Sequence, residues 1–280
     1  MVCFADNYWL FATSAVMLQA MTSTWLTLLD EAGLHTPLDE LTWCTTARDE
    51  CEFSVEVRGG DIRRASRKVG FKVLGTQQTF DNSCDVEIKS RIDKAWNAFH
   101  VHPDILCCKS ASMGSRLRCL QMLVASTLMW GAGSWNVTKK QRSLLRGVQQ
   151  RMMSKMLGFR RGPTESMAEY CARVNRCSAR LLETHGLQKW DIQQMRSYYD
   201  FMGSLARMRR HDPERISHQI LCYNDLDYIA RLQAEFGNQT HGRRFHVWRL
   251  ESALHKHARD WKRQAQSACE WNLDFSLRFV

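Results

Sequence analysis

Residues 1–12, MVCFADNYWLFA, decide how the first part of this 280-residue chain folds. Two short apolar runs, residues 1–5 and 8–12, flank a polar centre that contains Asp6 and Asn7. Both residue types favour turns, and apolar runs on either side of a short polar turn predict a β-hairpin. We therefore expect an antiparallel pair of strands with an acidic side chain at its tip.

The sequence after the hairpin predicts one helix and then more short strands. Ser14 is a good N-cap, and apolar residues recur at the helical period until Gly33. Residues 41–46 and 51–57 are predicted as two strands that a polar turn joins into a pair, and residues 71–75 (FKVLG) as a further strand. Everything up to about residue 80 thus has a β-rich pattern.

From residue 81 onward the apolar period is that of a helix. The first helix has one apolar face, made of Ile88, Ile92, Ala95, Trp96 and Phe99. Further helices are predicted over residues 113–130, 138–157, 164–186, 188–210, 213–234 and 243–270. The apolar stripe of the 138–157 helix comprises Leu144, Leu145, Val148, Met152 and Met156, and core positions elsewhere are assigned to Leu120, Leu123, Trp130 and Trp135.

Together these patterns predict an α+β protein with three regions. Residues 1–80 form a small, antiparallel β region, residues 81–158 a helical domain, and residues 164–280 a basic helical C-terminal region. The 44% apolar content is that of a globular protein, which excludes wholesale disorder. No repeat of fixed period is present.

Charge is divided unevenly along the chain. Residues 1–60 hold two basic and nine acidic side chains, net −7, whereas the other 220 residues hold 37 and 20, net +17. A basic body of this kind favours a polyanionic partner such as the nucleic-acid backbone, although a solvated, arginine-rich helical surface has the same composition. In the 138–157 helix, Arg151 and Lys155 lie at the edge of the apolar stripe, where their stems can cover apolar surface.

The eleven cysteines include no C-x-x-C pair, so no zinc finger or knuckle is predicted. Many have apolar neighbours, which favours buried thiols in a reducing compartment, and we expect an intracellular protein, cytoplasmic or nuclear. The N-terminal run lacks a basic segment and contains Asp6, so it is not predicted as a signal peptide. The apolar run at 120–135 is too short to span a membrane, and no membrane partner is expected.

Asp6 at the hairpin tip is the one position suited to metal chemistry, because a tight turn brings a carboxylate to the end of two strands. One carboxylate is insufficient for two-metal phosphoryl transfer, which needs ligands for two divalent ions about 3.5–4 Å apart. From these residues alone, a simple polar turn is the favoured interpretation.

The order of several short motifs resembles the reverse transcriptases of non-LTR, LINE-type retrotransposons. Residues 4–7 (FADN) resemble the F/Y-A-D-D box, and residues 71–75 (FKVLG) resemble the F-K-Y-L-G strand that holds the primer. Residues 87–99 (EIKSRIDKAWNAF), 117–135 (ending TLMWGAGSW) and 149–158 (QQRMMSKMLG) resemble the thumb helices that follow. The resemblance covers residues 1–158 and implies the end of a palm followed by a thumb.

The resemblance implies a role for each matching residue. Asp6 is expected to be the catalytic metal ligand for Mg²⁺, with Asn7 as its degenerate partner. Phe71, Lys72, Leu74 and Gly75 are expected at the primer grip. The RNA template and DNA primer are expected to follow the basic helix faces that carry Lys89, Arg91, Lys94, Lys139, Lys140 and Arg142; a solvated helix surface is the alternative for each of these cations.

Departures from the family pattern point away from catalysis. Asn7 replaces the second Asp of the box with a neutral amide, and Pro37 and Glu40 replace the family's usual Asn and Lys. The sequence starts three residues before the box, so we expect it to lack the fingers and the palm strand with the other catalytic carboxylate. We expect a truncated RNA-directed DNA polymerase that is inactive alone, holds no Mg²⁺ by itself and binds nucleic acid. A basic helical RNA- or DNA-binding module without enzymatic role and a non-functional pseudogene product are the alternatives.

Overall fold

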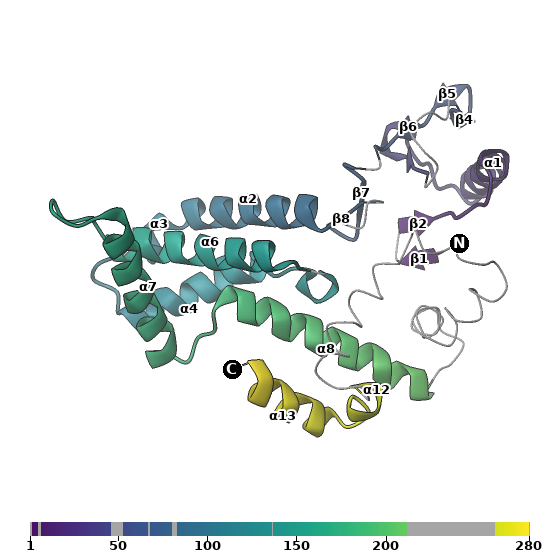
Figure 1. Cartoon of the computed structure of the whole chain (residues 1–280). Coiled ribbons are helices and arrows are strands. Elements are labelled where there is room, and N and C mark those ends of the chain that lie inside the picture. The colour runs from purple at the N-terminus through teal and green to yellow at the C-terminus, as the bar shows by residue number, and fades with distance from the viewer. Residues whose placement is uncertain are drawn as a thin grey trace. The chain divides into compact units, whose positions relative to one another are not determined.

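The computed structural model describes residues 2–4, 7–45, 53–66, 68–79, 83–135, 137–211 and 261–279. The chain divides into two compact units, Met1–Ser83 and Cys84–Val280 (Figure 1). Short strands belong to the first unit, and helices make up most of the described part of the second. This mixture confirms the predicted α+β class.

The first unit opens with the hairpin predicted from residues 1–12. Strands β1 (Val2–Phe4) and β2 (Asn7–Trp9) pair in antiparallel register. The connection between them, which carries Asp6, lies outside the described residues. Asn7 itself is the first residue of β2 rather than part of the turn, so the strands are joined by two residues.

Helix α1 (Ala15–Glu31) begins and ends where the sequence predicts. The Ser14 hydroxyl accepts a hydrogen bond from the Met17 backbone N–H at 3.2 Å, which caps the first turn. Gly33 follows the helix with a φ of +77°, a left-handed conformation that glycine adopts without steric cost. Leu26 and Leu29 of α1 are buried.

The middle strands pair differently from the prediction. After the 3₁₀ turn η1 (Leu38–Glu40), β3 (Thr42–Trp43) pairs in parallel with β6 (Arg63–Arg64), and β4 (Glu56–Val57) pairs in antiparallel register with β5 (Gly60–Asp61). The predicted pairing of residues 41–46 with 51–57, and an entirely antiparallel β region, are therefore wrong for the described residues.

Local backbone conformation explains the pairing of β4 with β5. Arg58 and Gly59 between these strands have φ values of +53° and +75°. Two consecutive residues with positive φ make the tight turn that matches the twist of antiparallel strands. The strand therefore turns back at Arg58, and β4 finds its partner immediately after it in the sequence.

Residues 71–75, predicted as one strand, form one arm and the turn of a second hairpin. Strand β7 (Phe71–Val73) pairs in antiparallel register with β8 (Thr76–Gln78). Leu74 and Gly75 form the turn, with φ values of +48° and +79°. A small core of α1 and the middle strands completes the unit, with buried Leu26, Leu29, Trp43, Val55, Val57 and Ile62.

The second unit contains the larger core. Its first helical elements are α2 (Asp85–Val101), α3 (Pro103–Leu106), α4 (Met113–Cys119), the π-helical η2 (Leu120–Ala125), α5 (Ser126–Leu128), the 3₁₀ turn η3 (Ala132–Ser134) and α6 (Lys139–Leu157). In Figure 1, α2 and α6 run side by side. The predicted faces of α2 and α6 pack together, with Ile88, Ile92, Ala95, Phe99, Leu145, Val148, Met152 and Met156 buried.

Two of the predicted core positions are on the surface. Trp130 is 57% exposed and Leu144 is 44% exposed. The helix predicted over residues 113–130 is interrupted by η2 and ends at Leu128, so Trp130 lies in the turn beyond it. Leu120 and Trp135 are buried, and Leu123 packs against the same core.

The remaining helices are α7 (Met167–Thr184), α8 (Trp190–His211), α12 (Trp261–Gln264) and α13 (Ala268–Phe279). Trp271 of α13 stacks on Tyr199 of α8, with ring centroids 3.7 Å apart, and forms a second core with Met202 and Trp261. The helix predicted over 243–270 is broken after Gln264, and its earlier part, like the helix predicted over 213–234, lies outside the described residues. The predicted boundary at 158–164 falls inside the second unit.

None of the helices in the described part of the chain combines the length and the apolar character that crossing a membrane requires.

Candidate nucleic-acid interface

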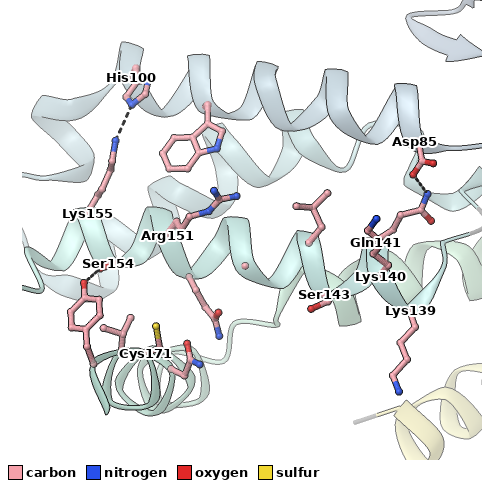
Figure 2. A pocket seen from close by; sticks show the side chains of 17 residues that line it. Asp85, His100, Lys139, Lys140, Gln141, Ser143, Arg151, Ser154, Lys155 and Cys171 are labelled. Atoms are coloured by element: carbon pink, nitrogen blue, oxygen red, sulfur yellow. Dashed lines mark hydrogen bonds between the residues drawn. The ribbon is translucent and has the colours of Figure 1, made fainter. Parts of the chain in front are cut away.

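A groove on the second unit gathers basic side chains between three helices. It has a volume of about 1250 Å³ and lies between α2, α6 and α7. The basic residues that line it are Lys139, Lys140, Arg151 and Lys155, together with His100, and Asp85 is the one carboxylate among its lining residues. Figure 2 shows Lys155 and His100 at one end of the groove and Lys139, Lys140 and Asp85 at the other.

The local structure of α6 fixes the first two of these cations at the start of the helix. Thr138 and Gln141 form a capping box. The side-chain oxygen of Gln141 accepts a hydrogen bond from the backbone N–H of Thr138 at 2.6 Å, and the backbone N–H of Gln141 donates to the Thr138 hydroxyl at 3.3 Å. Lys139 and Lys140 are thus fixed in the first turn. Residues 139, 143, 147, 151 and 155 follow one another at four-residue steps, and each step turns the side chain by about 40° around the helix axis, so this row winds around α6 as it passes along the groove.

At one end of the groove, the side chain of Gln141 links α6 to α2. Its Nε2 donates to the Asp85 carboxylate at 2.6 Å (Figure 2). Asp85 is the first residue of α2, where a carboxylate interacts favourably with the positive end of the helix dipole. This carboxylate therefore has a structural partner inside the protein.

At the other end, Lys155 lies against two aromatic rings of α2. Its ammonium group is 5.0 Å from the ring centroid of Trp96 and 3.5 Å from Nε2 of His100. The Trp96 and His100 rings are themselves 5.5 Å apart and tilted by 30°. Trp96 is half-buried and packs against the core, whereas His100 is exposed. The Lys155 ammonium thus makes a cation–π contact with Trp96.

Helix α7 forms the opposite wall. The Tyr170 hydroxyl and the Ser154 hydroxyl are 3.0 Å apart, which ties α7 to α6 (Figure 2). Before α7, Glu165 accepts two hydrogen bonds from Arg173, both at 2.8 Å, and one from the Gly162 N–H at 3.1 Å. The Arg173 guanidinium, with the backbone N–H of Gly162, lowers the pKa of Glu165 to about 2.

Part of the lining of the groove is apolar. Trp96, Leu144 and Val174 belong to it, and we call these three residues the apolar floor. Gly147 lies at the centre of the α6 wall, and a Cβ placed on it would meet no atom within 4 Å. Leu144, which the apolar stripe predicts to be buried, is exposed and contributes to this surface.

The predicted nucleic-acid-binding residues are distributed over several surfaces. Lys139 and Lys140 line the groove, and Lys89 and Lys94 are exposed on α2 without lining it. Arg142 points the other way, with Nη1 3.2 Å from the sulfur of Met195 in α8. Arg151 and Lys155 also line the groove, although they are not among the residues predicted to bind nucleic acid.

Arg91 has a structural position. It is 6% exposed and its Nε donates to the carboxylate of Glu87 at 2.6 Å, one turn earlier in α2. A buried guanidinium that is paired in this way is held by the fold. We therefore leave Arg91 out of the interface. The sequence does not show that Arg91 is buried while Lys94 is exposed, because helix periodicity alone does not tell which neighbouring element covers a face.

The predicted primer-grip and metal residues belong to the first unit. Phe71 and Lys72 lie in β7, and Leu74 and Gly75 form the turn that follows. Asp6 lies outside the described residues, and Asn7 pairs with Phe4 at the end of β2. In the described ranges, no three His, Cys, Asp or Glu side chains gather as a metal site.

The donors of the hairpin do not fit the pair of Mg²⁺ ions that the family resemblance implies. Its sequence supplies one carboxylate, Asp6, and the neutral amide of Asn7. Two adjacent divalent ions need more negative charge than one carboxylate provides. We derive no catalytic step from this hairpin.

No protein-family model matches the sequence, and no curated protein or solved structure matches it either.

Proposed function

We propose that the Cys84–Val280 unit binds the backbone of nucleic acid along its groove. The observation that carries this proposal is that four basic side chains of α6 line the groove, against one carboxylate that already has an internal partner. Among the described residues, none of Lys139, Lys140, Arg151 and Lys155 forms an ion pair. Cations that converge without a counter-charge attract a polyanion.

The groove is the right length for a polymer. Lys139 and Lys155 are sixteen residues apart on α6, which corresponds to about 24 Å at the ~1.5 Å rise of an α-helix. At ~3.4 Å per nucleotide of a stacked strand, this distance spans about seven phosphates. A small metabolite would occupy only one end of such a row.

Salt dependence tests the backbone contact. We expect the affinity for a fluorescein-labelled 20-nucleotide RNA, measured by anisotropy between 50 and 200 mM KCl, to fall linearly with salt on logarithmic axes. The slope should be about −0.7 per phosphate contacted by a single strand. No measurable binding at 50 mM KCl would end the proposal.

A pair of matched variants locates the contact. Lys139→Glu/Lys140→Glu should weaken binding and reduce the salt slope by about two contacts. Acidic residues in the first turn favour the helix dipole, so this variant does not weaken α6. Arg176→Glu/Arg180→Glu, which makes the same change in charge on exposed positions of α7 outside the groove, should keep the wild-type affinity. Equal losses in both variants would show binding by net charge alone.

Protection of cysteines from alkylation gives a second way to map where RNA binds. Cys171 is exposed and lines the groove, whereas Cys107 and Cys269 are exposed outside it. Saturating RNA should protect Cys171 from N-ethylmaleimide and leave Cys107 and Cys269 reactive, as measured by mass spectrometry. Equal protection of all three thiols would contradict binding in the groove.

We further propose that the chain is the non-copying relative of a LINE-type reverse transcriptase, with the first unit corresponding to the end of the palm. The ordered motifs FADN, FKVLG and TLMWGAGSW support this origin, and the single carboxylate of the hairpin supports the absence of catalysis. The purified chain should incorporate no labelled dTTP on an RNA template primed with oligo-dT. Incorporation above that of an Asp6→Ala variant would refute the inactive part of the proposal.

A further inference from the structure

We infer that the groove accepts an unpaired strand in preference to a duplex, with one or more bases turned toward its apolar floor. This inference rests on the proposed function, because it specifies which form of nucleic acid the same groove binds. The four basic side chains that line the groove suit phosphates, and its apolar floor suits bases. A strand satisfies both surfaces only if its bases are free to turn inward.

The first argument is the chemistry of the floor. Trp96, Leu144 and Val174 line the groove together with its four basic side chains. In a duplex the faces of the bases are stacked inside the helix, and the phosphates are the outermost groups. A duplex would therefore contact only the basic side chains of the groove. An unpaired strand can bury its base faces against apolar and aromatic side chains, which is how proteins bind single strands.

The second argument is the exposed ring of His100. It lies next to Trp96, tilted by 30°, and within 3.5 Å of the Lys155 ammonium. A flat ring with a cation beside it provides both a surface for stacking and a contact for the neighbouring phosphate. Trp96, with Lys155 over its ring and the core behind it, holds this arrangement in place.

The third argument is the space at Gly147. Gly147 lines the groove and lies midway along the part of α6 that does so, between Lys139 and Lys155. A Cβ placed on Gly147 would meet no atom within 4 Å. Glycine in a helix interior makes the helix less stable than alanine does. The opening therefore persists although the helix would be more stable without it, and it leaves room for a planar base.

The test compares a 12-nucleotide thymidine strand with the 12-base-pair duplex that it forms with its complement, by anisotropy at 100 mM KCl. We expect the wild-type protein to bind the single strand about tenfold more tightly. Removing one stacking ring typically lowers single-strand affinity roughly 5- to 150-fold. His100→Ala should therefore lower the affinity for the strand at least about fivefold and change the affinity for the duplex less than about twofold, and His100→Phe should restore it.

Gly147→Phe provides an independent variant that fills the groove. A side chain at this position improves the helix and blocks the floor, so we expect it to lower single-strand affinity and leave duplex affinity unchanged. Gly147→Ala is the matched control and should bind both ligands like the wild type, because a methyl group leaves the opening free.

The outcomes separate this inference from the proposed function. If the duplex binds as tightly as the strand while Lys139→Glu/Lys140→Glu still weakens both, the groove binds nucleic acid and the inference is wrong. If neither ligand binds, both are wrong. If a poly-glutamate peptide binds as tightly as the strand, the groove recognises an acidic protein surface, and both the proposed function and the inference are overturned.

Discussion

Cys108 and Cys44 show how the surroundings of a thiol set its reactivity. The sulfur of Cys108 is 3.0 Å from the Ser110 hydroxyl, and this hydrogen bond, with the backbone N–H groups of Ser110 and Ala111, lowers the pKa of the thiol. Burial raises the pKa of Cys44 to about 11. The thiolate is the reactive form of cysteine.

We predict that iodoacetamide at pH 7.5 alkylates Cys108 well before Cys44, because a lower pKa leaves more thiolate at neutral pH. Tryptic mass spectrometry over a time course measures both rates in one sample. Ser110→Ala should slow the reaction of Cys108 and leave that of Cys44 unchanged. Equal rates at the two positions would contradict the structure around Cys108.

Glu165 gives a pH-dependent contribution to stability. Its pKa of about 2 in the folded protein lies below the ordinary value of 4.5, so its ionised form favours folding. The contribution is complete above about pH 4.5 and is lost as the pH falls through about 2. We predict that Glu165→Gln lowers the free energy of unfolding at pH 6, and that the difference from wild type shrinks steadily between pH 4.5 and 2. Urea denaturation at each pH measures it; a difference independent of pH would contradict this role.

Among the elements, the β7–β8 hairpin depends on one glycine. Gly70 has a φ of +69°, and a Cβ placed on it would lie 1.6 Å from the carbonyl oxygen of Gln78 in β8. The backbone of β8 therefore occupies the space that any side chain at this position would need. A substitution requires the two segments to separate.

We predict that Gly70→Ala opens this hairpin, measured as faster proteolysis within residues 68–79. Gly59→Ala is the matched control, because Gly59 also has positive φ, +75°, but a Cβ placed on it would meet no atom within 4 Å. The control should lose only the cost of the left-handed backbone, about 1–2 kcal/mol, without local opening. Similar proteolysis of both variants would mean that the close approach at Gly70 is not needed.

The elements also show how far the sequence predicts the fold. The Ser14 cap and the apolar period predict α1 closely, and the apolar period predicts α6 closely, because both are local signals. The pairing of β3 with β6 is not predicted, because two-residue strands carry no pattern that identifies a distant partner. The helical spacing of Trp130 predicts a core position, whereas the helix ends before it.

The groove shows the same limit for the candidate site. The basic face of the 138–157 helix predicts Lys139 and Lys140, and they line the groove. Arg142 on the same helix contacts α8, and Arg91 is buried, because each depends on which neighbouring element packs there. The position of α7 beside α6 creates the groove, and nothing local in either helix predicts that position.

The two units of the molecule differ in the size of their cores. Among the described residues, the cluster of the first unit buries six apolar side chains, whereas the main cluster of the second buries nineteen. Buried apolar area is the main source of stability, and regions with few buried contacts open at lower free energy.

We predict that hydrogen exchange proceeds faster in the strands of the first unit than in α2 and α6. Exchange measured by mass spectrometry at pH 7 should leave peptides from 88–99 and 145–156 as the last to exchange. Peptides from 53–66 should exchange at least about tenfold sooner, since each 1.4 kcal/mol of opening free energy changes the rate tenfold. Uniform protection over both units would show that they unfold together.

Helix α6 begins with two lysines and has no acidic residue in its first turn. The backbone amides there already carry partial positive charge, so the two ammonium groups are repelled by the positive end of the helix dipole and destabilise α6. An anion that neutralises them would remove this repulsion as it binds. Occupancy and folding are then linked: the free chain melts at a lower temperature than the loaded one, and degradation in a cell would remove molecules that have found no partner.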